Sequence, residues 1–191
     1  MATEIISVAL AYILGSISSA YIVGRFIGKI DMIREGDGRV SASAVHEKLG
    51  VIPFLLVVIM DVGEGVAAVL IARLLTDSLI VWLIAGFAAV VGHDWSVFLK
   101  FRGGMGATTT YGVLVALVWW QTLVGAAMAG IVLFITKKSG LSTAILIGAA
   151  TAILLVQYVL QRAPLILAIY PVILILLMIL KRFQLARTGP R

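Results

Sequence analysis

Residues 51–75, VIPFLLVVIMDVGEGVAAVLIARLL, decide the fold class of this protein. The stretch is apolar almost throughout, and its charged residues are Asp61, Glu64 and Arg73. About 20 apolar residues in an α-helix cross the roughly 30 Å of hydrocarbon in a bilayer. The stretch therefore predicts a transmembrane helix that carries two carboxylates along its length.

Similar apolar stretches recur along the chain and agree with its composition. Of the 191 residues, 62% are hydrophobic and 13% are charged, whereas soluble domains have about 45–50% apolar and about 25% charged residues. This composition excludes a cytosolic enzyme, a disordered tail and a nucleic-acid-binding module. We expect an all-α integral membrane protein with one domain, residues 1–191, whose further apolar stretches are Ile5–Val23, Ser78–Leu99, Ala107–Ile135, Leu141–Leu160 and Leu165–Leu180.

The stretch Ala107–Ile135 is too long for one span and short for two. Because Arg102 precedes it, Lys137 follows it and cytoplasmic loops are rich in basic residues, we favour a hairpin that turns at residues 119–121 (WWQ). A single tilted helix is the alternative. The hairpin gives about seven transmembrane helices with the N-terminus outside and the C-terminus in the cytoplasm. The cytoplasmic segments are then the loops 24–50, 100–107 and 136–140 and the tail 181–191.

The charge and the cysteine content narrow the classes of site and partner. A net charge of +6 reflects the topology and contact with anionic headgroups, so it predicts membrane lipids and no nucleic acid as partners. The chain has no cysteine, which excludes disulfides, thiolate metal sites and cysteine nucleophiles. No group of residues has the sequence spacing of metal ligands, and no serine lies in a nucleophile elbow. We therefore expect neither a metal nor a cofactor.

The long polar loop after the first apolar stretch contains the segment REGDGRVSASA, residues 34–44. Gly36 and Gly38 allow the backbone to turn several N–H groups toward one point, as an anion requires. Arg34 and Arg39 add charge-assisted donors for a phosphate. An ordinary surface turn and a disordered loop are the alternatives.

A second candidate segment, KFRGGMGATT at residues 100–109, leads into a predicted helix. Gly103, Gly104 and Gly106 lie just before the helix, where its N-terminus offers unpaired N–H groups and the positive end of the helix dipole. Thr108 adds a hydroxyl, and Arg102 lies beside the glycines. The pattern favours an anion site over a flexible interhelical turn, which stays the alternative.

The third candidate lies inside the predicted span 51–75, where Asp61 and Glu64 share one helix face at i and i+3. Carboxylates at membrane depth are costly, so this pair is expected to face other helices and to have partners or carry protons. His93, near the cytoplasmic end of the next apolar stretch, is a candidate partner. A structural pairing and a proton relay of the kind found in transporters are both open.

In this order and between these spans, the three segments resemble the acyl-phosphate:glycerol-3-phosphate acyltransferase (PlsY) family over nearly the whole chain. Residues 11–17 (AYILGSI) are similar to the family's first helix, and residues 34–44 to its R-x-x-G-S-G-N-x-G-A-T-N stretch. Residues 61–65 (DVGEG) correspond to D-x-x-K-G, and residues 92–106 to G-H-x-x-P-V-F-x-x-F-K-G-G-K-G. The resemblance implies seven helices in the cell (inner) membrane with the active face in the cytoplasm. It also implies acyl phosphate and glycerol-3-phosphate as substrates and lysophosphatidic acid, a phospholipid precursor, as product.

The resemblance also implies roles for individual residues. His93 and Arg102 become candidate catalytic residues. The candidate binding residues for the substrate phosphates are Gly36, Gly38, Arg39, Ser41, Ser43, Gly103, Gly104, Gly106, Thr108, Ser139 and Ser142.

The chain departs from the family motifs at several polar positions. The replacements are Asp37 for a serine, Arg39 for an asparagine, Glu47 for a basic residue, and Glu64 and Met105 for lysines. With an effective dielectric constant of about 20, a carboxylate about 4 Å from a phosphate charge costs about 4 kcal/mol, which is roughly three orders of magnitude in affinity. The carboxylates Asp37, Glu47 and Glu64 and the neutral Met105 therefore weaken a site for phosphate-bearing substrates.

Two functions follow from these observations. The first is the family's acyl transfer to glycerol-3-phosphate in phospholipid biosynthesis, or a variant of it with another acceptor. The second is a non-catalytic pseudoenzyme, which binds lipid or serves as a structural subunit of a larger membrane protein complex and keeps its glycine-rich turns for folding. A transporter is a third hypothesis, which would require a polar path past the intramembrane carboxylates.

Overall fold

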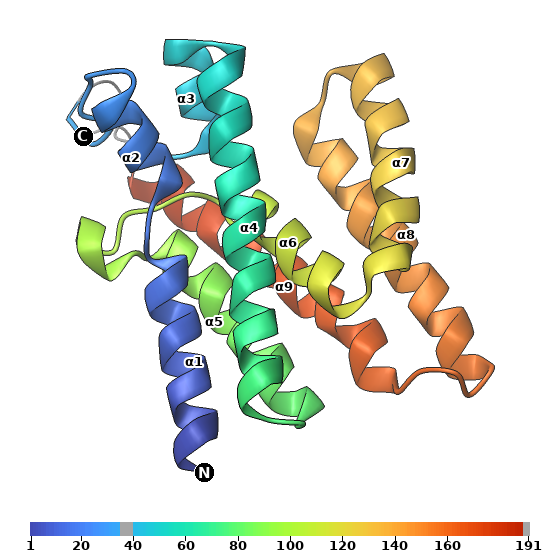
Figure 1. Ribbon diagram of the computed structural model, residues 1–191. Coiled ribbons are helices and arrows are strands. Elements are labelled where there is room, and N and C mark those ends of the chain that lie inside the picture. Colours follow the sequence, from blue (N-terminus) through green and yellow to red (C-terminus); the bar gives the residue numbers. More distant parts are fainter. Residues whose placement is uncertain (35–39, 189–191) are drawn as a thin grey trace. The chain divides into compact units, whose positions relative to one another are not determined.

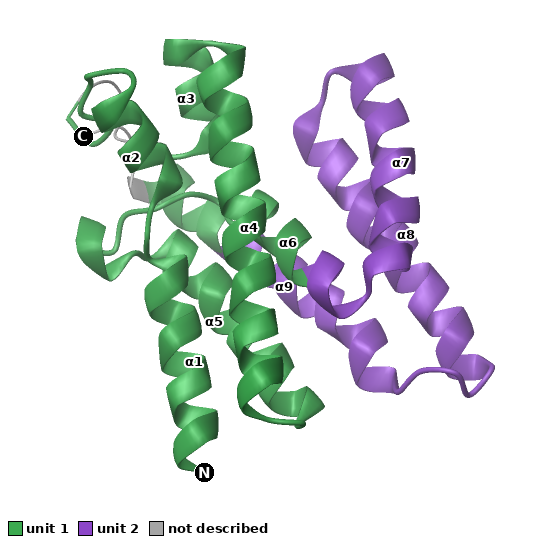
Figure 2. Ribbon diagram, viewed as in Figure 1, with its two compact units in different colours: residues 1–113, 181–191 green, residues 114–180 purple. Residues whose placement is uncertain are grey.

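The computed structural model describes residues 1–34 and 40–188, and this part of the chain is built from helices and their connections (Figure 1). The helices are α1 (Ala2–Gly15), α2 (Ser19–Phe26), α3 (Ala42–Leu49), α4 (Val51–Leu75), α5 (Leu79–Asp94), the 3-10 helix η1 (Val97–Leu99), α6 (Ala107–Leu117), α7 (Trp119–Thr136), α8 (Ser139–Val159) and α9 (Leu165–Thr188). The chain forms two compact units, residues 1–113 with 181–191 and residues 114–180 (Figure 2).

Several helices have the length and composition of membrane spans. Within the described residues, five stretches are long and apolar enough to cross a bilayer: Ala2–Phe26, Val51–Leu75, Trp119–Thr136, Ser139–Val159 and Leu165–Arg187. Leu79–Asp94 and Ala107–Leu117 are shorter apolar helices. The all-α architecture is thus confirmed, whereas the seven crossings and their orientation stay predictions.

The predicted span Ile5–Val23 is interrupted near its middle, and serines satisfy both helix ends there. The Ser16 hydroxyl donates to the carbonyl of Tyr12 at 2.8 Å, one turn back in α1. Ser18 caps α2 by accepting a hydrogen bond from the backbone N–H of Tyr21 at 3.3 Å. The Ser18 side chain supplies an acceptor for a backbone N–H at the start of α2, and the Ser16 hydroxyl adds a second donor to a carbonyl that already accepts from a backbone N–H. Such side-chain partners make a break tolerable in an apolar stretch.

The long apolar run Ala107–Ile135 is also divided. Val118, with φ of −142°, separates α6 from α7, so the run is not one continuous helix. The break lies one residue before the WWQ segment, which forms the first turn of α7.

The first polar loop is packed where the structure describes it. Ser41 caps the short helix α3, and its hydroxyl accepts from the backbone N–H of Ala44 at 3.3 Å. Met32 and Val40, on either side of the undescribed residues, are buried in an apolar cluster that includes Val57 of α4. Burial of these side chains ties Met32 and Val40 to the helices.

In the larger unit, α1 and α5 pack against each other through small residues. A side chain at Gly15 would meet the backbone of Ala89, and one at Gly92 would meet the backbone of Tyr12 and Ser16. Small residues at an interface let helix backbones approach closely, which favours helix association where lipid supplies no hydrophobic driving force.

The smaller unit has its own interhelical contacts between α7 and α8. The Ser142 hydroxyl donates to the carbonyl of Ala129 at 2.7 Å, and the Gln121 amide donates to the Gln157 side chain at 2.7 Å. Gly125 lies against the backbone of Leu146. Small residues and interhelical hydrogen bonds thus hold this helix pair together.

Candidate functional site

A buried polar centre forms in the larger unit where α4 and α5 meet. Asp61 and Glu64 project from α4, and His93 projects from the last turn of α5. The Nε2 atom of His93 lies 4.0 Å from Oδ2 of Asp61, and its Nδ1 atom lies 3.6 Å from Oε1 of Glu64. The side chains of Glu64 and His93 are 7% and 8% exposed. The structure therefore brings together the three residues that sequence reasoning only offered as candidate partners.

Hydroxyl groups from two other elements hold the carboxylate of Asp61. Ser19, the first residue of α2, donates to Oδ1 of Asp61, and Thr108 in the first turn of α6 donates to Oδ2 at 2.7 Å. Thr108 is thus a hydrogen-bond donor within the polar centre. Sequence reasoning did not select Ser19, although serines within an apolar stretch are a signal, because a hydroxyl in lipid needs a partner.

The turn between α5 and α6 wraps around His93. The backbone N–H of Gly104 donates to the carbonyl of His93 at 3.2 Å. A Cβ atom at Gly104 would overlap the His93 ring, and one at Gly103 would overlap its carbonyl. Gly106 has φ of +61°, a conformation that glycine adopts without strain. Gly103 and Gly104 are therefore needed for close packing against the histidine, and Gly106 for the backbone conformation of the turn, whatever they bind.

Arg102 lies at the outer side of the same turn. Its backbone pairs with Ser96 in an isolated antiparallel bridge, and its side chain is exposed. Ser96 anchors the turn, because its hydroxyl donates to the carbonyl of Ser16 at 2.5 Å. Within residues 1–34 and 40–188, the Arg102 guanidinium has no hydrogen-bond or ion-pair partner, and its backbone is fixed in the turn that follows the histidine.

The C-terminal end of α9 adds residues that sequence reasoning used for topology alone. The Lys181 ammonium donates to the carbonyl of Asp94 and lies 4.6 Å from the centre of the Trp95 ring. The indole N–H of Trp95 donates to the Gln184 side chain at 2.8 Å. Asp94 is fully buried. The position of Lys181 directly after the last apolar stretch was the only feature of the sequence that drew attention to it. The sequence did not indicate its partners, because they lie almost ninety residues away in the chain.

The structure describes only some of the candidate residues of the first loop. Gly36, Asp37, Gly38 and Arg39 lie outside the described residues. Ser41 is the helix cap, and its hydroxyl lies 3.1 Å from the hydroxyl of Ser43. Two serine hydroxyls are therefore paired at the start of α3, directly after the segment that carries the glycines.

The remaining candidates belong to the smaller unit or to the surface. Ser142 uses its hydroxyl within the α7–α8 pair, and Ser139 is an exposed residue at the start of α8. Met105, at a family lysine position, is 39% exposed, and Glu47 is exposed on α3.

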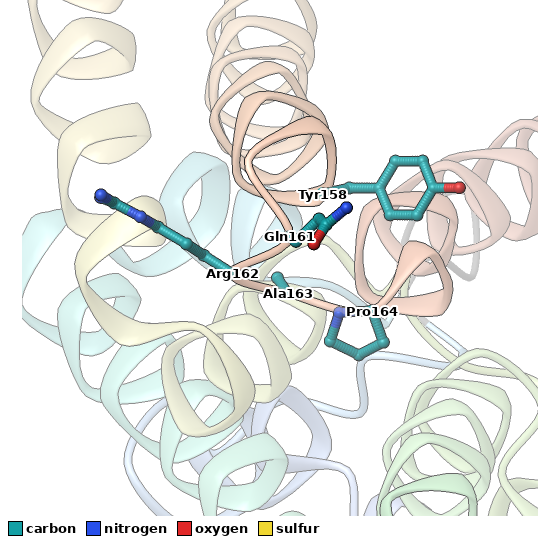
Figure 3. Close-up of a pocket in the computed structure, with 5 residues that line it drawn as sticks. All are labelled: Tyr158, Gln161, Arg162, Ala163 and Pro164. Carbon is teal, nitrogen blue, oxygen red and sulfur yellow. The ribbon is translucent and has the colours of Figure 1, made fainter.

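A separate open hollow of about 410 Å³ lies at the turn between α8 and α9 (Figure 3). Its lining residues are Tyr158, Gln161, Arg162, Ala163 and Pro164. The hollow includes none of the candidate residues and does not contribute to the polar centre.

The polar centre has the donor set of a metal site. One ligand atom from each of Asp61, Glu64 and His93 can be chosen so that all lie within 4.8 Å of one another. Sequence spacing gave no sign of this group, because the residues come from two helices and meet only in the folded chain. Together, these features define a class: an all-helical membrane protein with a buried carboxylate–histidine centre closed by a glycine turn.

Comparisons with known proteins identify the family within this class. The family model for glycerol-3-phosphate acyltransferase matches residues 5–188. Glycerol-3-phosphate acyltransferase 2 of Moorella thermoacetica is 37% identical over 158 residues, which cover 81% of this chain and 78% of the relative. The enzyme of Shouchella clausii is 38% identical over 73% of this chain and 69% of its own length. This chain therefore belongs to the glycerol-3-phosphate acyltransferase family, as its motifs indicated.

Solved structures agree with this assignment. A crystal structure of PlsY, an integral membrane glycerol 3-phosphate acyltransferase, in its glycerol 3-phosphate form matches with a TM-score of 0.80 and 26% identity over 97% of this chain and 91% of that chain. The lysophosphatidic acid form matches with a TM-score of 0.77 and 27% identity. The resemblance to PlsY and the integral membrane class are confirmed.

Proposed function

We propose that this protein transfers an acyl group from acyl phosphate to glycerol-3-phosphate and forms lysophosphatidic acid for phospholipid biosynthesis. The observation that carries this proposal is the glycine turn packed around His93, with the exposed Arg102 fixed at its outer side. Family membership and the names of the relatives support it. The basic residues of the predicted cytoplasmic loops favour a reaction on the cytoplasmic side of the cell (inner) membrane.

Each retained part has a task in this reaction. The oxygen of the acceptor hydroxyl attacks the acyl carbonyl carbon, the bond to the phosphate oxygen breaks, and phosphate leaves with the electron pair. Arg102 supplies charge-assisted hydrogen bonds to phosphate oxygens. His93, which lies beside Asp61 and Glu64, accepts the hydroxyl proton in this proposal. Because acyl phosphate is already activated, proximity and charge neutralisation supply most of the rate.

The test is acyl transfer from palmitoyl phosphate to radiolabelled glycerol-3-phosphate by the purified protein in detergent. Arg102→Ala is expected to reduce turnover by at least about a hundredfold, because it removes the donor to the phosphate. Arg187→Ala, which removes an exposed arginine of α9, is the control and is expected to keep wild-type turnover. Equal rates for both variants would refute the role of Arg102.

A second candidate function is a non-catalytic lipid-binding or structural subunit of a larger membrane complex. The observation that favours it is the carboxylate of Glu64, buried against His93 where the family motif has lysine. A second carboxylate beside Asp61 repels the phosphates that the family binds. Absence of turnover in a folded preparation, together with a stoichiometric partner in mass spectrometry of the natively purified protein, would support this candidate over acyl transfer.

A further inference from the structure

We propose that Asp61, Glu64 and His93 bind one divalent transition-metal ion. This inference goes beyond acyl transfer and does not depend on it, because binding of a metal ion is measured without substrate.

The spacing of the donor atoms suits a single ion. Metal–ligand bonds to histidine nitrogen and carboxylate oxygen are about 2.0–2.2 Å long, so two ligands on one ion lie roughly 3.0–4.4 Å apart. An imidazole binds a given ion through one nitrogen, and Nδ1 of His93 lies 3.6 Å from Oε1 of Glu64. One ligand atom from each of Asp61, Glu64 and His93 can be chosen so that all three lie within 4.8 Å of one another. One imidazole with two carboxylates is a ligand set for ions such as Zn²⁺ and Mn²⁺.

Two buried atoms of the centre have no hydrogen-bond partner. Oε1 of Glu64 and Nδ1 of His93 are both inaccessible to solvent and have no hydrogen-bond partner among the described residues, and they face each other across 3.6 Å, which is within ion-pair distance but beyond hydrogen-bond distance. Buried polar atoms are normally paired, and leaving one unpaired costs about 1–3 kcal/mol, and more when the group is charged. A metal ion bound between them satisfies both atoms at once.

The net charge of the polar centre also favours a divalent cation. Lys181 donates to the backbone carbonyl of Asp94, and its ammonium attracts the Asp94 carboxylate through space. The ion pairs recorded for Asp61 and Glu64 within the described chain are both with His93. With a neutral imidazole the two carboxylates carry two negative charges, which one divalent ion neutralises. Glu64 stands where the family motif has lysine, so the substitution changes the local charge by the same two units.

The surrounding hydroxyls orient the proposed ligand Asp61. Ser19 donates to one carboxylate oxygen and Thr108 donates to the other. Metal ligands are typically held in this way by hydrogen bonds from residues that do not touch the ion themselves. The carboxylate is therefore fixed in orientation and keeps a free lone pair on each oxygen.

The test measures bound metal directly. The full-length protein is loaded with Zn²⁺ or Mn²⁺ in detergent, separated from free ions by gel filtration and analysed by inductively coupled plasma mass spectrometry. We expect about one ion per chain in the wild-type protein and at least about tenfold less in the Glu64→Gln and His93→Gln variants. His46→Gln, the other histidine of the chain, and Asp77→Asn, an exposed carboxylate, are the matched controls and should retain the ion.

A further variant separates loss of metal from loss of folding. Glu64→Lys brings its own positive charge, so it should stay folded and bind no metal. Removal of the ion with a chelator should lower the melting temperature of the wild-type protein and leave that of Glu64→Lys unchanged. The proposal is overturned if folded wild-type protein retains neither ion, or if His93→Gln and His46→Gln bind equal amounts, which would identify the ion as adventitious. An imidazole bound to a metal ion cannot also accept a proton, so a bound ion would reassign the proton-transfer step proposed for His93. The Arg102→Ala assay tests acyl transfer separately.

Discussion

Gly65 offers a sharp test of the packing that builds the polar centre, because Gly63 in the same helix is its natural control. Both residues lie in α4, one on either side of Glu64. A Cβ atom at Gly65 would overlap the carbonyl oxygen of Thr109 and come within 2.8 Å of the backbone nitrogen of Val113, both in α6. A Cβ atom at Gly63 would meet nothing within 4 Å. We therefore expect Gly65→Ala to destabilise the protein and Gly63→Ala to be harmless.

The magnitude follows from two opposing terms. Replacing glycine by alanine inside a helix favours the folded state by roughly 0.8–1 kcal/mol at either position. Forcing an extra methyl group into a packed interface costs about 1–3 kcal/mol, and backbone atoms cannot move aside as a side chain can. The difference between the two variants removes the helix term and leaves the packing term, so Gly65→Ala should be about 1–3 kcal/mol less stable than Gly63→Ala.

The assay is thermal unfolding of the purified variants in the same detergent. The readout is the fraction of protein that still elutes as a folded, monodisperse peak after heating. The wild-type protein should melt between the two variants or together with Gly63→Ala. Equal melting temperatures for Gly65→Ala and Gly63→Ala would refute the close approach of α4 and α6. The contact between Asp61 and Thr108 would then lose its structural basis.

Three further substitutions test individual contacts by the same melting assay. Lys181→Met keeps the length of the side chain but removes its ammonium, and it should lower the stability by about 1.5–3 kcal/mol because a charged hydrogen bond is lost. Arg182→Met, at an exposed neighbour, should change the stability little, and equal losses of stability in both variants would contradict the buried role of Lys181. Thr108→Val is nearly isosteric and should cost about 1–3 kcal/mol by leaving an oxygen of Asp61 without its donor, so an unchanged melting temperature would contradict that bond. Gln157→Leu removes a hydrogen bond between α8 and α7, and it should cost about 0.6–1.7 kcal/mol, as interhelical bonds do in membranes; a more stable variant would contradict this contribution.

The helices depart from the predicted apolar spans at two breaks. The apolar run 107–135 was too long for one span, and the structure divides it at Val118, next to the predicted turn. The break at Ser16–Ser18 was not foreseen, because apolar residues flank the serines and hydropathy averages over them. Only the backbone partners of these serines show that one helix ends and another begins there.

The candidate site was partly visible in the sequence. Asp61 and Glu64 stood out because carboxylates are costly in lipid, and the glycines of residues 103–106 stood out by their spacing. The sequence did not reveal that Gly103 and Gly104 pack against the carbonyl and the ring of His93. A glycine required for close packing and one required for binding an anion look alike in a sequence, and the neighbouring atoms alone distinguish them.

The sequence by itself determined the all-helical membrane class, the apolar segments and, through its motifs, the acyltransferase family. These properties depend on local composition and on residues that are close in the chain. The tertiary structure decided which polar groups meet: Ser19, Asp61, His93 and Thr108 come from four helices, and Lys181 reaches Asp94 from the far end of the chain. Contacts of this kind depend on how helices pack, and the sequence of one helix carries no information on which face of another it will meet.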